Sequence, residues 1–181
     1  MAKMRERKSA GRTPNSESQT LKPKTTNSKN PVSEFLSFGY RTAFGVRHSD
    51  LGTQRRLIAA AAKARSQAVA PYSNFKVGAA LLTREGEIIT GANVESASYG
   101  LTCCAERVAL FTALTGGKSD FVAVAVVART RNGPMPCGAC RQLLAEYAPD
   151  AKVYVADSRA LNRLREFAVQ DLLPETFLEV R

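Results

Sequence analysis

The chain has 181 residues, enough for one domain with a substantial core, and its 26 Lys and Arg against 16 Asp and Glu give a formal net charge of +10. No apolar run approaches the roughly 20 residues that a membrane-spanning helix needs. All four cysteines fall between residues 103 and 140. Such clustering, in a mid-sized chain with no secretory signal, argues against a disulfide scaffold and indicates metal binding in a reducing compartment.

Residues 1–50 are predicted to form a disordered, basic extension. They hold ten Lys and Arg against four Asp and Glu, and residues 1–30 contain few large apolar side chains. Such a segment buries too little surface to offset the entropy of ordering. Organelle targeting is an alternative, which three glutamates weaken. We otherwise expect a cytoplasmic protein with no membrane contact and no specific nucleic-acid binding.

Residues 51–181 are expected to form one α/β domain. The run at 121–128 is apolar throughout, as in a strand buried on both faces. In chain order, propensity and apolar pattern first predict a helix over 53–70 that ends at Pro71, followed by a hairpin of strands over 76–83 and 87–94. A helix over 103–117 and a strand over 121–128 come next. The rest of the domain is predicted to contain a helix over 137–149, a strand over 152–157 and a last strand that includes 167–170. This order predicts a three-layer α/β/α fold with a mixed five-stranded sheet.

Cysteines occur at the predicted starts of two helices. Cys137 and Cys140 form a P-C-x-x-C pattern and share one face of a helical turn, and Cys104 lies near the first turn of the other helix. The positive end of a helix favours thiolate over thiol. Two such ends brought together would offer three thiolates to one cation, a ligand set that suits Zn²⁺.

A three-ligand zinc site leaves one coordination position for water, whose pKa zinc lowers towards about 7. Glu106 is the carboxylate nearest to the cysteines in the sequence, two residues after Cys104. This makes Glu106 the candidate general acid and base beside the zinc-bound water. Three thiolates and Zn²⁺ carry a net charge of −1, which is costly to bury. We therefore expect Arg107 or Arg141 to hydrogen-bond the sulfurs; the alternative is that both lie on helix surfaces.

Two other interpretations of the cysteines are open. Cys103 could complete a closed Cys₄ site, but adjacent side chains on a helix point about 100° apart, so the backbone there would have to be irregular. The four cysteines could also be buried without a metal, which the P-C-x-x-C pattern disfavours. His48 is the only histidine and lies outside the predicted domain, so it is left out of the site.

Four stretches together resemble the small homotetrameric, zinc-dependent cytidine deaminases of the cytidine and deoxycytidylate deaminase superfamily. They are YSNFKVGAAL (72–81), GANVESASYGLTCCAER (91–107), PCGACRQLLAEYAP (136–149) and DLLPETF (171–177). The resemblance extends from about Thr53 to Phe177. It implies the family's fold, one zinc ion in each subunit of a homotetramer, and the hydrolytic deamination of cytidine and 2′-deoxycytidine in pyrimidine salvage.

The resemblance also implies roles for individual residues. The metal centre would consist of the zinc ligands Cys104, Cys137 and Cys140, the proton carrier Glu106, and Arg107 bonded to the thiolates. The substrate contacts would be Phe75 against the pyrimidine, Asn93 and Glu95 on the ribose hydroxyls, Ala105, and, from across a subunit interface, Tyr99 and Phe177. Without these roles, Phe75 would be a core residue, Tyr99 a surface residue and Phe177 a packing residue.

The sequence departs from the family pattern at two places. Ser96 stands where N-V-E is usually followed by Asn, and few residues follow Phe177, which weakens its interface role. Three other functions are open: a deaminase of a nucleoside-like compound such as blasticidin S, a nucleic-acid editing deaminase, and a catalytically silent zinc protein. The N-V-E stretch suits a free ribose, and editing deaminases usually have histidine at the position of Cys104.

Overall fold

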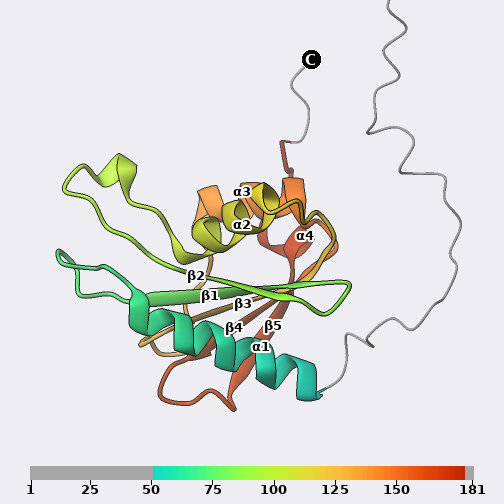
Figure 1. The fold of residues 1–181 in the computed structure, drawn as a ribbon, viewed down its shortest axis with the longest axis horizontal. Helices are drawn as coiled ribbons and strands as arrows, with labels where there is room; N and C mark the ends of the chain where they lie inside the picture. Colours follow the sequence, from blue (N-terminus) through green and yellow to red (C-terminus); the bar gives the residue numbers. More distant parts are fainter. Residues whose placement is uncertain (1–50, 178–181) are drawn as a thin grey trace, which may run out of the picture. The chain divides into compact units, whose positions relative to one another are not determined.

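The structure is a computed structural model that describes residues 51–177. Within this range the chain forms one mixed sheet with helices on both faces (Figure 1). The predictions made for residues 1–50, an extension with an alternative role in targeting, lie outside the described residues, as does His48.

The sheet has five strands in the order β2-β1-β3-β4-β5. The strands β3 and β4 run parallel, and every other neighbouring pair is antiparallel. The bounds are β1 (Val77–Thr83), β2 (Ile88–Ala92), β3 (Phe121–Ala128), β4 (Lys152–Asp157) and β5 (Leu164–Ala168). The central strand β3 is buried along its whole length, as its apolar sequence predicts. The prediction of an α/β fold with a mixed five-stranded sheet is confirmed.

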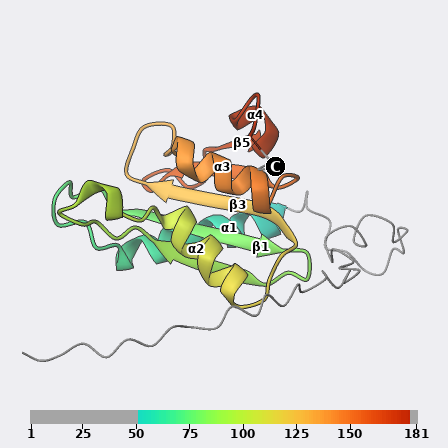
Figure 2. The same ribbon diagram turned by 90° about the horizontal axis from the view of Figure 1, so that it is seen from above.

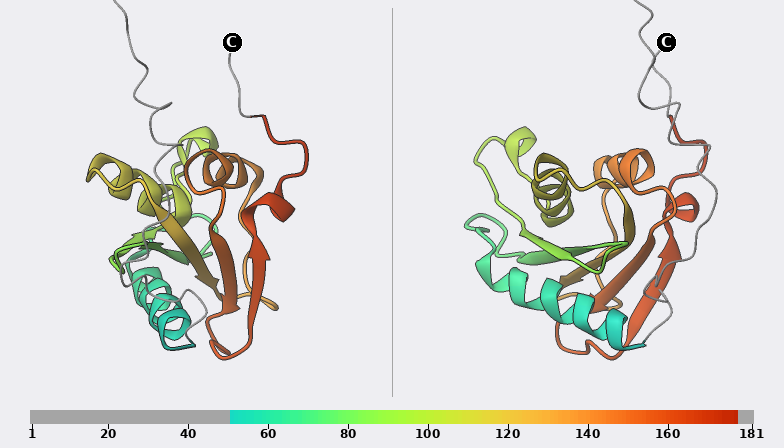
Figure 3. Two further views of the ribbon diagram at one scale, coloured as in Figure 1. Left: turned by 90° about the vertical axis from the view of Figure 1, so that its right-hand side faces the viewer. Right: turned by 45° about the vertical axis from the view of Figure 1, so that its right-hand side comes forward.

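Helices cover the two faces of the sheet unequally (Figures 1 and 2). Helix α1 (Leu51–Ala64) packs on one face, where Leu57 and Ala61 join an apolar cluster with Val127. Helices α2 (Ala105–Thr115) and α3 (Gly138–Tyr147) lie on the opposite face, over a second apolar cluster that includes Val124 and Val126. Figure 3 shows this division from the side. Alternate residues of β3 therefore support the helices on opposite faces.

Helix α2 approaches the sheet closely because Gly91 in β2 has no side chain. A Cβ at Gly91 would lie 2.4 Å from the amide nitrogen of Ala109 and 2.5 Å from the carbonyl oxygen of Ala105. These separations are shorter than any van der Waals contact, so any larger residue would displace the helix. Gly91 therefore determines how closely the first turn of α2, which follows Cys104, approaches the sheet.

The first predicted helix is too long. Helix α1 ends at Ala64, the 3₁₀ turn η2 (Arg65–Gln67) follows, and Val69 is extended and forms a bridge with Val94. In this bridge, the Val69 amide donates to the Asn93 carbonyl at 2.9 Å, and the Glu95 amide donates to the Val69 carbonyl at 2.8 Å. The alanine-rich sequence has high helix propensity, but these long-range hydrogen bonds override it.

The last strand lies earlier than predicted. Residues Leu164–Ala168 form β5, whereas Val169–Leu172 form the short helix α4. Lys152 and Glu166 stand near each other on the paired strands β4 and β5 and form an ion pair at 2.5 Å. The segment 164–170 mixes charged and apolar residues without a clear period, so the sequence pattern alone could not locate the strand.

Candidate active site

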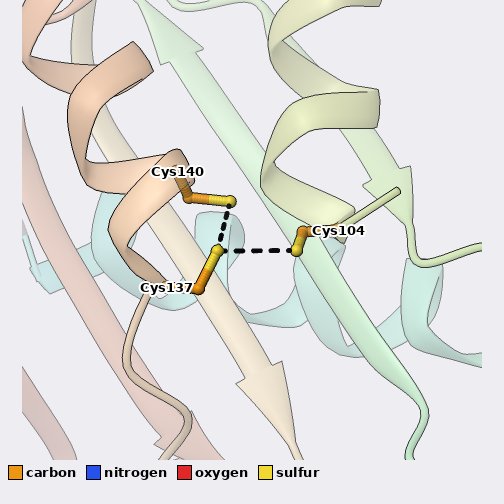
Figure 4. Close-up of side chains that lie close together, drawn as sticks. All are labelled: Cys104, Cys137 and Cys140. Carbon is orange, nitrogen blue, oxygen red and sulfur yellow. Dashed lines mark hydrogen bonds between the residues drawn. The ribbon is translucent and has the colours of Figure 1, made fainter. Parts of the chain in front are cut away.

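Three of the four cysteines converge between helices α2 and α3 (Figure 4). The Sγ atoms of Cys104 and Cys137 lie 3.8 Å apart, and those of Cys137 and Cys140 lie 3.6 Å apart. All three sulfurs lie within 4.8 Å of one another. Cys103 is not a member of this group: it is half-buried, and its backbone pairs with Val94. The geometry therefore favours a three-cysteine site over a Cys₄ site.

Both helices begin at a cysteine. Cys104 is the N-cap residue of α2, and Cys137 is the N-cap residue of α3; both have an extended backbone. The Cys104 carbonyl accepts from the Val108 amide, and the Cys137 carbonyl accepts from the Arg141 amide, which are the first hydrogen bonds of the two helices. Cys140 follows in the first turn of α3 and is buried. The free amide groups at these two ends concentrate positive potential around the sulfurs.

The environment of the site separates the pKa of Cys104 from that of Cys140 even before a metal binds. The neighbouring Cys140 thiol, then Cys137 and Arg107, lower the pKa of Cys104 to about 5. The pKa of Cys140 is raised instead, first because it donates to the Cys104 sulfur and second because it is buried. Cys104 is therefore a thiolate at neutral pH, the form in which cysteine binds metals.

The three sulfurs fit a zinc ion. Tetrahedral zinc with Zn–S bonds of about 2.3 Å requires sulfur–sulfur separations of about 3.8 Å. The two sulfur–sulfur distances of 3.8 and 3.6 Å are close to that value. A soft, anionic ligand set of this kind selects Zn²⁺ over Mg²⁺ or Ca²⁺.

Glu106 is a buried carboxyl group beside the cysteines. Its exposed fraction is 6%, and burial raises its pKa from the ordinary 4.5 to about 7, with a further increase from the Cys104 thiolate. A carboxyl group with a pKa near neutrality can both accept and donate protons under physiological conditions. Glu106 lies in the first turn of α2, two residues after Cys104.

The two candidate arginines have different partners. Arg107 donates through Nη2 to the carbonyl of Thr102 and to the Sγ atom of Cys104, the latter at 3.9 Å. Arg141 turns away from the sulfurs: its Nε donates to the Pro136 carbonyl at 2.8 Å and its Nη1 to the Leu172 carbonyl at 3.1 Å. Arg107 therefore offsets thiolate charge directly, whereas Arg141 supports the backbone that leads into α3.

A cavity of about 260 Å³ opens beside the cysteines. It is lined by cysteine, carboxyl and apolar side chains: Phe75, Val77, Asn93, Glu95, Thr102, Cys104, Ala105, Glu106, Val126, Pro134, Met135 and Cys137. A second hollow of about 300 Å³ adjoins it and shares Glu95 and Thr102; its other lining residues are Tyr72, Ser73, Ser96 and Tyr99. The cavity thus contains two of the three thiols together with Glu95 and Glu106, and the adjoining hollow adds hydroxyl-bearing side chains.

Most of the residues singled out in the sequence line this cavity, but Cys140, Arg107, Tyr99 and Phe177 do not. Tyr99, in the 3₁₀ turn η3 (Tyr99–Leu101), is 86% exposed and lines only the second hollow. Phe177 is 67% exposed, and its carbonyl accepts a hydrogen bond from Gln142. Within the described residues, neither aromatic ring is enclosed by its own chain.

The cavity also uses residues that sequence reasoning missed. Thr102 precedes the cysteine pair directly, and Pro134 and Met135 precede P-C-x-x-C, so adjacency to the motifs was a usable signal. Val126 gave no such signal, because it belongs to a strand whose apolar residues look alike in the sequence, whereas Val77 lies inside the resembling stretch at 72–81 but was not given a role. Ser73 lies inside one of the resembling stretches but was not given a role.

An α/β fold that clusters three thiols and a buried carboxyl group beside one cavity is typical of a zinc-dependent hydrolytic enzyme. Comparison with known proteins agrees: residues 52–156 match the family model described as the cytidine and deoxycytidylate deaminase zinc-binding region. A cytidine deaminase from Halalkalibacterium halodurans is 52% identical over 125 residues, which cover 68% of this chain and 93% of that protein. The chain belongs to the cytidine and deoxycytidylate deaminase family.

Solved structures give the same result. The crystal structure of a cytidine deaminase from Burkholderia pseudomallei superposes with a TM-score of 0.65 at 50% identity, covering 67% of this chain and 97% of that one. A blasticidin-S deaminase from Bacillus cereus is more distant, 32% identical over 54% of this chain and 74% of that protein. In the described part of the chain, no helix combines the length and apolar character needed to cross a bilayer.

Proposed function

We propose that this protein is a zinc-dependent cytidine deaminase that hydrolyses cytidine and 2′-deoxycytidine to uridine and 2′-deoxyuridine, with release of ammonia. The observation that carries the proposal is a cluster of three thiols beside a single cavity, which two of them line together with a carboxyl group whose pKa is about 7. Relatives named cytidine deaminase at up to 52% identity support the choice of substrate. Pyrimidine salvage is the role that this reaction implies.

Cys104, Cys137 and Cys140 would hold the zinc ion, which supplies the Lewis acidity that makes hydroxide available at neutral pH. In the overall reaction the bond from C4 to the amino nitrogen breaks, and a bond from C4 to the oxygen of water forms. The two protons of that water end on N3 and on the departing ammonia. Glu106 would carry both protons, because its raised pKa lets it accept and donate in turn.

Four residues would bind the substrate. Phe75 offers an apolar ring for the pyrimidine, and Ala105 adds apolar surface beside Glu106. Glu95 and Asn93, which line the same cavity, would bind the ribose hydroxyls. A carboxylate that accepts hydroxyl groups discriminates against analogues without them, because its charge would then lose a partner.

The charge of the cavity favours a nucleoside over a nucleotide. Its described lining includes two carboxyl groups, of Glu95 and Glu106, and neither lysine nor arginine. The adjoining hollow likewise adds hydroxyl groups and no cation among its described residues. A phosphate on the 5′ position would meet negative charge without a compensating partner, which argues against deoxycytidylate and against a nucleic-acid strand as substrates.

The exposed aromatic residues support a homotetramer with one zinc ion in each subunit. Tyr99, which lines the second hollow, is 86% exposed, and Leu101 in the same 3₁₀ turn is 74% exposed; large side chains so exposed in one short turn indicate a contact surface. We propose that Tyr99 and Phe177 complete the site of another subunit. Sedimentation would test this assignment: an active monomer would contradict it.

The remaining proposals concern the organisation of the chain. We propose that residues 51–181 are the catalytic domain and that residues 1–50 are a basic extension outside it; the family match over residues 52–156 supports this boundary. Free cysteines at a metal site need a reducing compartment such as the cytoplasm. Fractionation of cells that express the full chain would test this location.

A spectrophotometric assay with cytidine tests the proposed activity, with Glu106→Gln as the matched inactive variant. The wild-type protein should convert cytidine, and the variant should keep zinc and fold but lose turnover by at least about 10³-fold. Deoxycytidine 5′-monophosphate, blasticidin S and single-stranded DNA serve as competing substrates. No turnover of cytidine, or faster turnover of one of these, would refute the proposal, and full activity of the variant would refute the role of Glu106.

A further inference from the structure

We infer that Ser73 is a positioning residue that couples the carboxylate proposed to bind the ribose, Glu95, to the ring proposed to pack on the base, Phe75. This inference rests on the proposed function and deepens it. No role for Ser73 follows from the chemistry of deamination, because its hydroxyl group is not among the reacting groups. The hydrogen bonds of the loop at residues 71–75 carry the argument.

Glu95 is held by three donors from this loop. Its Oε2 atom accepts from the amides of Tyr72 and Ser73, at 2.9 and 3.1 Å, and its Oε1 atom accepts from the hydroxyl of Ser73. The pKa of Glu95 is lowered, and the hydroxyl of Ser73 is the largest cause. The carboxylate is therefore charged and fixed in orientation before a substrate enters.

The hydroxyl of Ser73 has a second partner. Its Oγ atom accepts a hydrogen bond from the Phe75 amide at 2.9 Å. A serine hydroxyl can donate one hydrogen bond, and here it donates to Glu95. The lone pairs of Oγ therefore remain available to accept from the Phe75 amide. One side chain thus fixes the direction of the carboxylate and the start of the segment that carries the ring.

Asn93 holds the backbone on the C-terminal side of the same residue, Phe75. Its Nδ2 donates to the Phe75 carbonyl at 3.0 Å, and its Oδ1 accepts from the Val77 amide at 2.8 Å. Both polar residues of the N-V-E stretch are therefore bonded to the segment around Phe75. On the Glu95 side, the connection passes through Ser73, which is the link that a single substitution can remove.

Loss of this hydroxyl should weaken recognition of the sugar more than recognition of the base. In Ser73→Ala, Glu95 keeps two amide donors but loses the donor to Oε1, the oxygen with the fewest other protein partners. The carboxylate can then turn away from a ribose hydroxyl, and the Phe75 amide loses its acceptor. Hydrogen bonds to a charged group are the strong ones, so the effect should be readily measurable.

The experiment compares two proteins on two substrates, so that the effect of the substitution can be measured with and without the sugar hydroxyls. The ratio kcat/KM is measured for wild type and Ser73→Ala with cytidine and with 2′,3′-dideoxycytidine, which has no hydroxyl for Glu95. We expect kcat/KM for cytidine to fall about 10- to 100-fold, mainly through KM, and kcat/KM for the dideoxy compound to fall by no more than about 3-fold. Ser73→Thr, which keeps a hydroxyl group, should restore most of the activity.

Ser66→Ala is the matched control, because the hydroxyl of Ser66 is exposed and donates to the carbonyl of Lys63, outside the cavity. It should leave kcat/KM unchanged for both substrates. Equal losses for the two substrates in Ser73→Ala would overturn the coupling but leave the proposed deaminase activity intact. Failure of the wild-type protein to convert cytidine would overturn both.

Discussion

The Sγ atoms of Cys104 and Cys137 lie 3.8 Å apart, although 33 positions separate the two residues in the chain. Each cysteine caps the N-terminus of a different helix, and both helices rest on the same face of the sheet (Figure 4). The metal site is thus formed by the packing of α2 against α3, and its geometry depends on how each helix lies on the strands. Predictions about metal binding are therefore also predictions about fold.

Replacement of Cys104 by alanine should abolish zinc binding and activity. The variant retains only two thiols, both on α3, which is too few for a stable three-ligand site. Bound zinc, measured by atomic absorption after gel filtration, should fall from one ion per chain to less than about 0.1. Turnover of cytidine should fall by at least about 10³-fold.

Cys103→Ala is the matched control for this experiment. Cys103 is adjacent to Cys104 in the chain but lies outside the cluster of three sulfurs. Its backbone amide and carbonyl pair with Val94, and alanine keeps both groups. The variant should bind one zinc ion and remain active; loss of zinc from Cys103→Ala would show that the site uses a fourth sulfur.

The buried Glu106 should make the stability of the zinc-free protein depend on pH. Its pKa rises from 4.5 in the unfolded chain to about 7 in the folded one, because burial disfavours the charged form. Between these values the folded protein retains a proton that the unfolded chain has lost. The stabilising effect of this proton is complete below about pH 4.5 and is lost as the pH rises through about 7, a change of about 3 kcal/mol in the free energy of unfolding.

Urea unfolding in a chelator and a reductant, at several pH values, measures this effect. The free energy of unfolding of the wild-type protein, minus that of Glu106→Gln, should decrease by about 3 kcal/mol between pH 4.5 and pH 8. Both proteins carry the same cysteines, and the effect of the Cys104 thiolate on the pKa of Glu106 is part of the measured difference. A difference that is constant with pH would mean that Glu106 titrates normally and is not desolvated.

The sequence was sufficient to predict the central strand of the sheet, but not where the first helix ends or where the last strand lies. Strand β3 is a continuous apolar run bounded by polar residues, and its predicted bounds agree with the structure residue for residue. The end of α1 and the position of β5 could not be predicted, because both depend on hydrogen bonds to distant strands. Val69 leaves the helical conformation to pair with Val94, and β5 is located by its pairing with β4.

The candidate site shows the same limit. Cys104, Cys137, Cys140 and Glu106 could be selected because their spacing is local and their chemistry is distinctive. The partners of the arginines were less accessible: the cysteine pattern alone left Arg107 and Arg141 open, and the family resemblance was needed to select Arg107, which is the one directed at a sulfur. The bonds from Ser73 to Glu95 were also hidden, since they join loops that are 22 positions apart.

Gly91→Ala should destabilise the protein and disturb the metal site. The added Cβ would lie 2.4 Å from the amide nitrogen of Ala109, and backbone of a packed helix cannot move cheaply. Overpacking of this kind costs about 1–3 kcal/mol or more. Thermal unfolding should show a lower midpoint, and zinc affinity should fall because α2 carries Cys104. Gly100→Ala is the control: it has open space around its Cβ position, and its midpoint should be unchanged.

Arg141→Gln should lower stability while leaving zinc bound. Arg141 is half-buried and donates to two carbonyls, of Pro136 before α3 and of Leu172 at the end of α4, which ties the C-terminal segment to the helix that carries Cys137 and Cys140. Loss of hydrogen bonds from a charged group of this kind costs about 1.5–3 kcal/mol. Arg141→Lys should restore little, because an ammonium group cannot span both carbonyls as the planar guanidinium does.

Arg159→Gln provides the comparison for Arg141. Arg159 pairs with Asp157: the arginine side chain is 58% exposed, and the aspartate side chain, 13% exposed, also accepts from the Arg159 amide, so loss of the exposed guanidinium should cost less than about 1 kcal/mol. Chemical unfolding should therefore separate the two variants, with a clear loss for Arg141→Gln and almost none for Arg159→Gln, at equal zinc content. If Arg141→Gln instead lost zinc without losing stability, the guanidinium would act on the sulfurs rather than on the backbone around them.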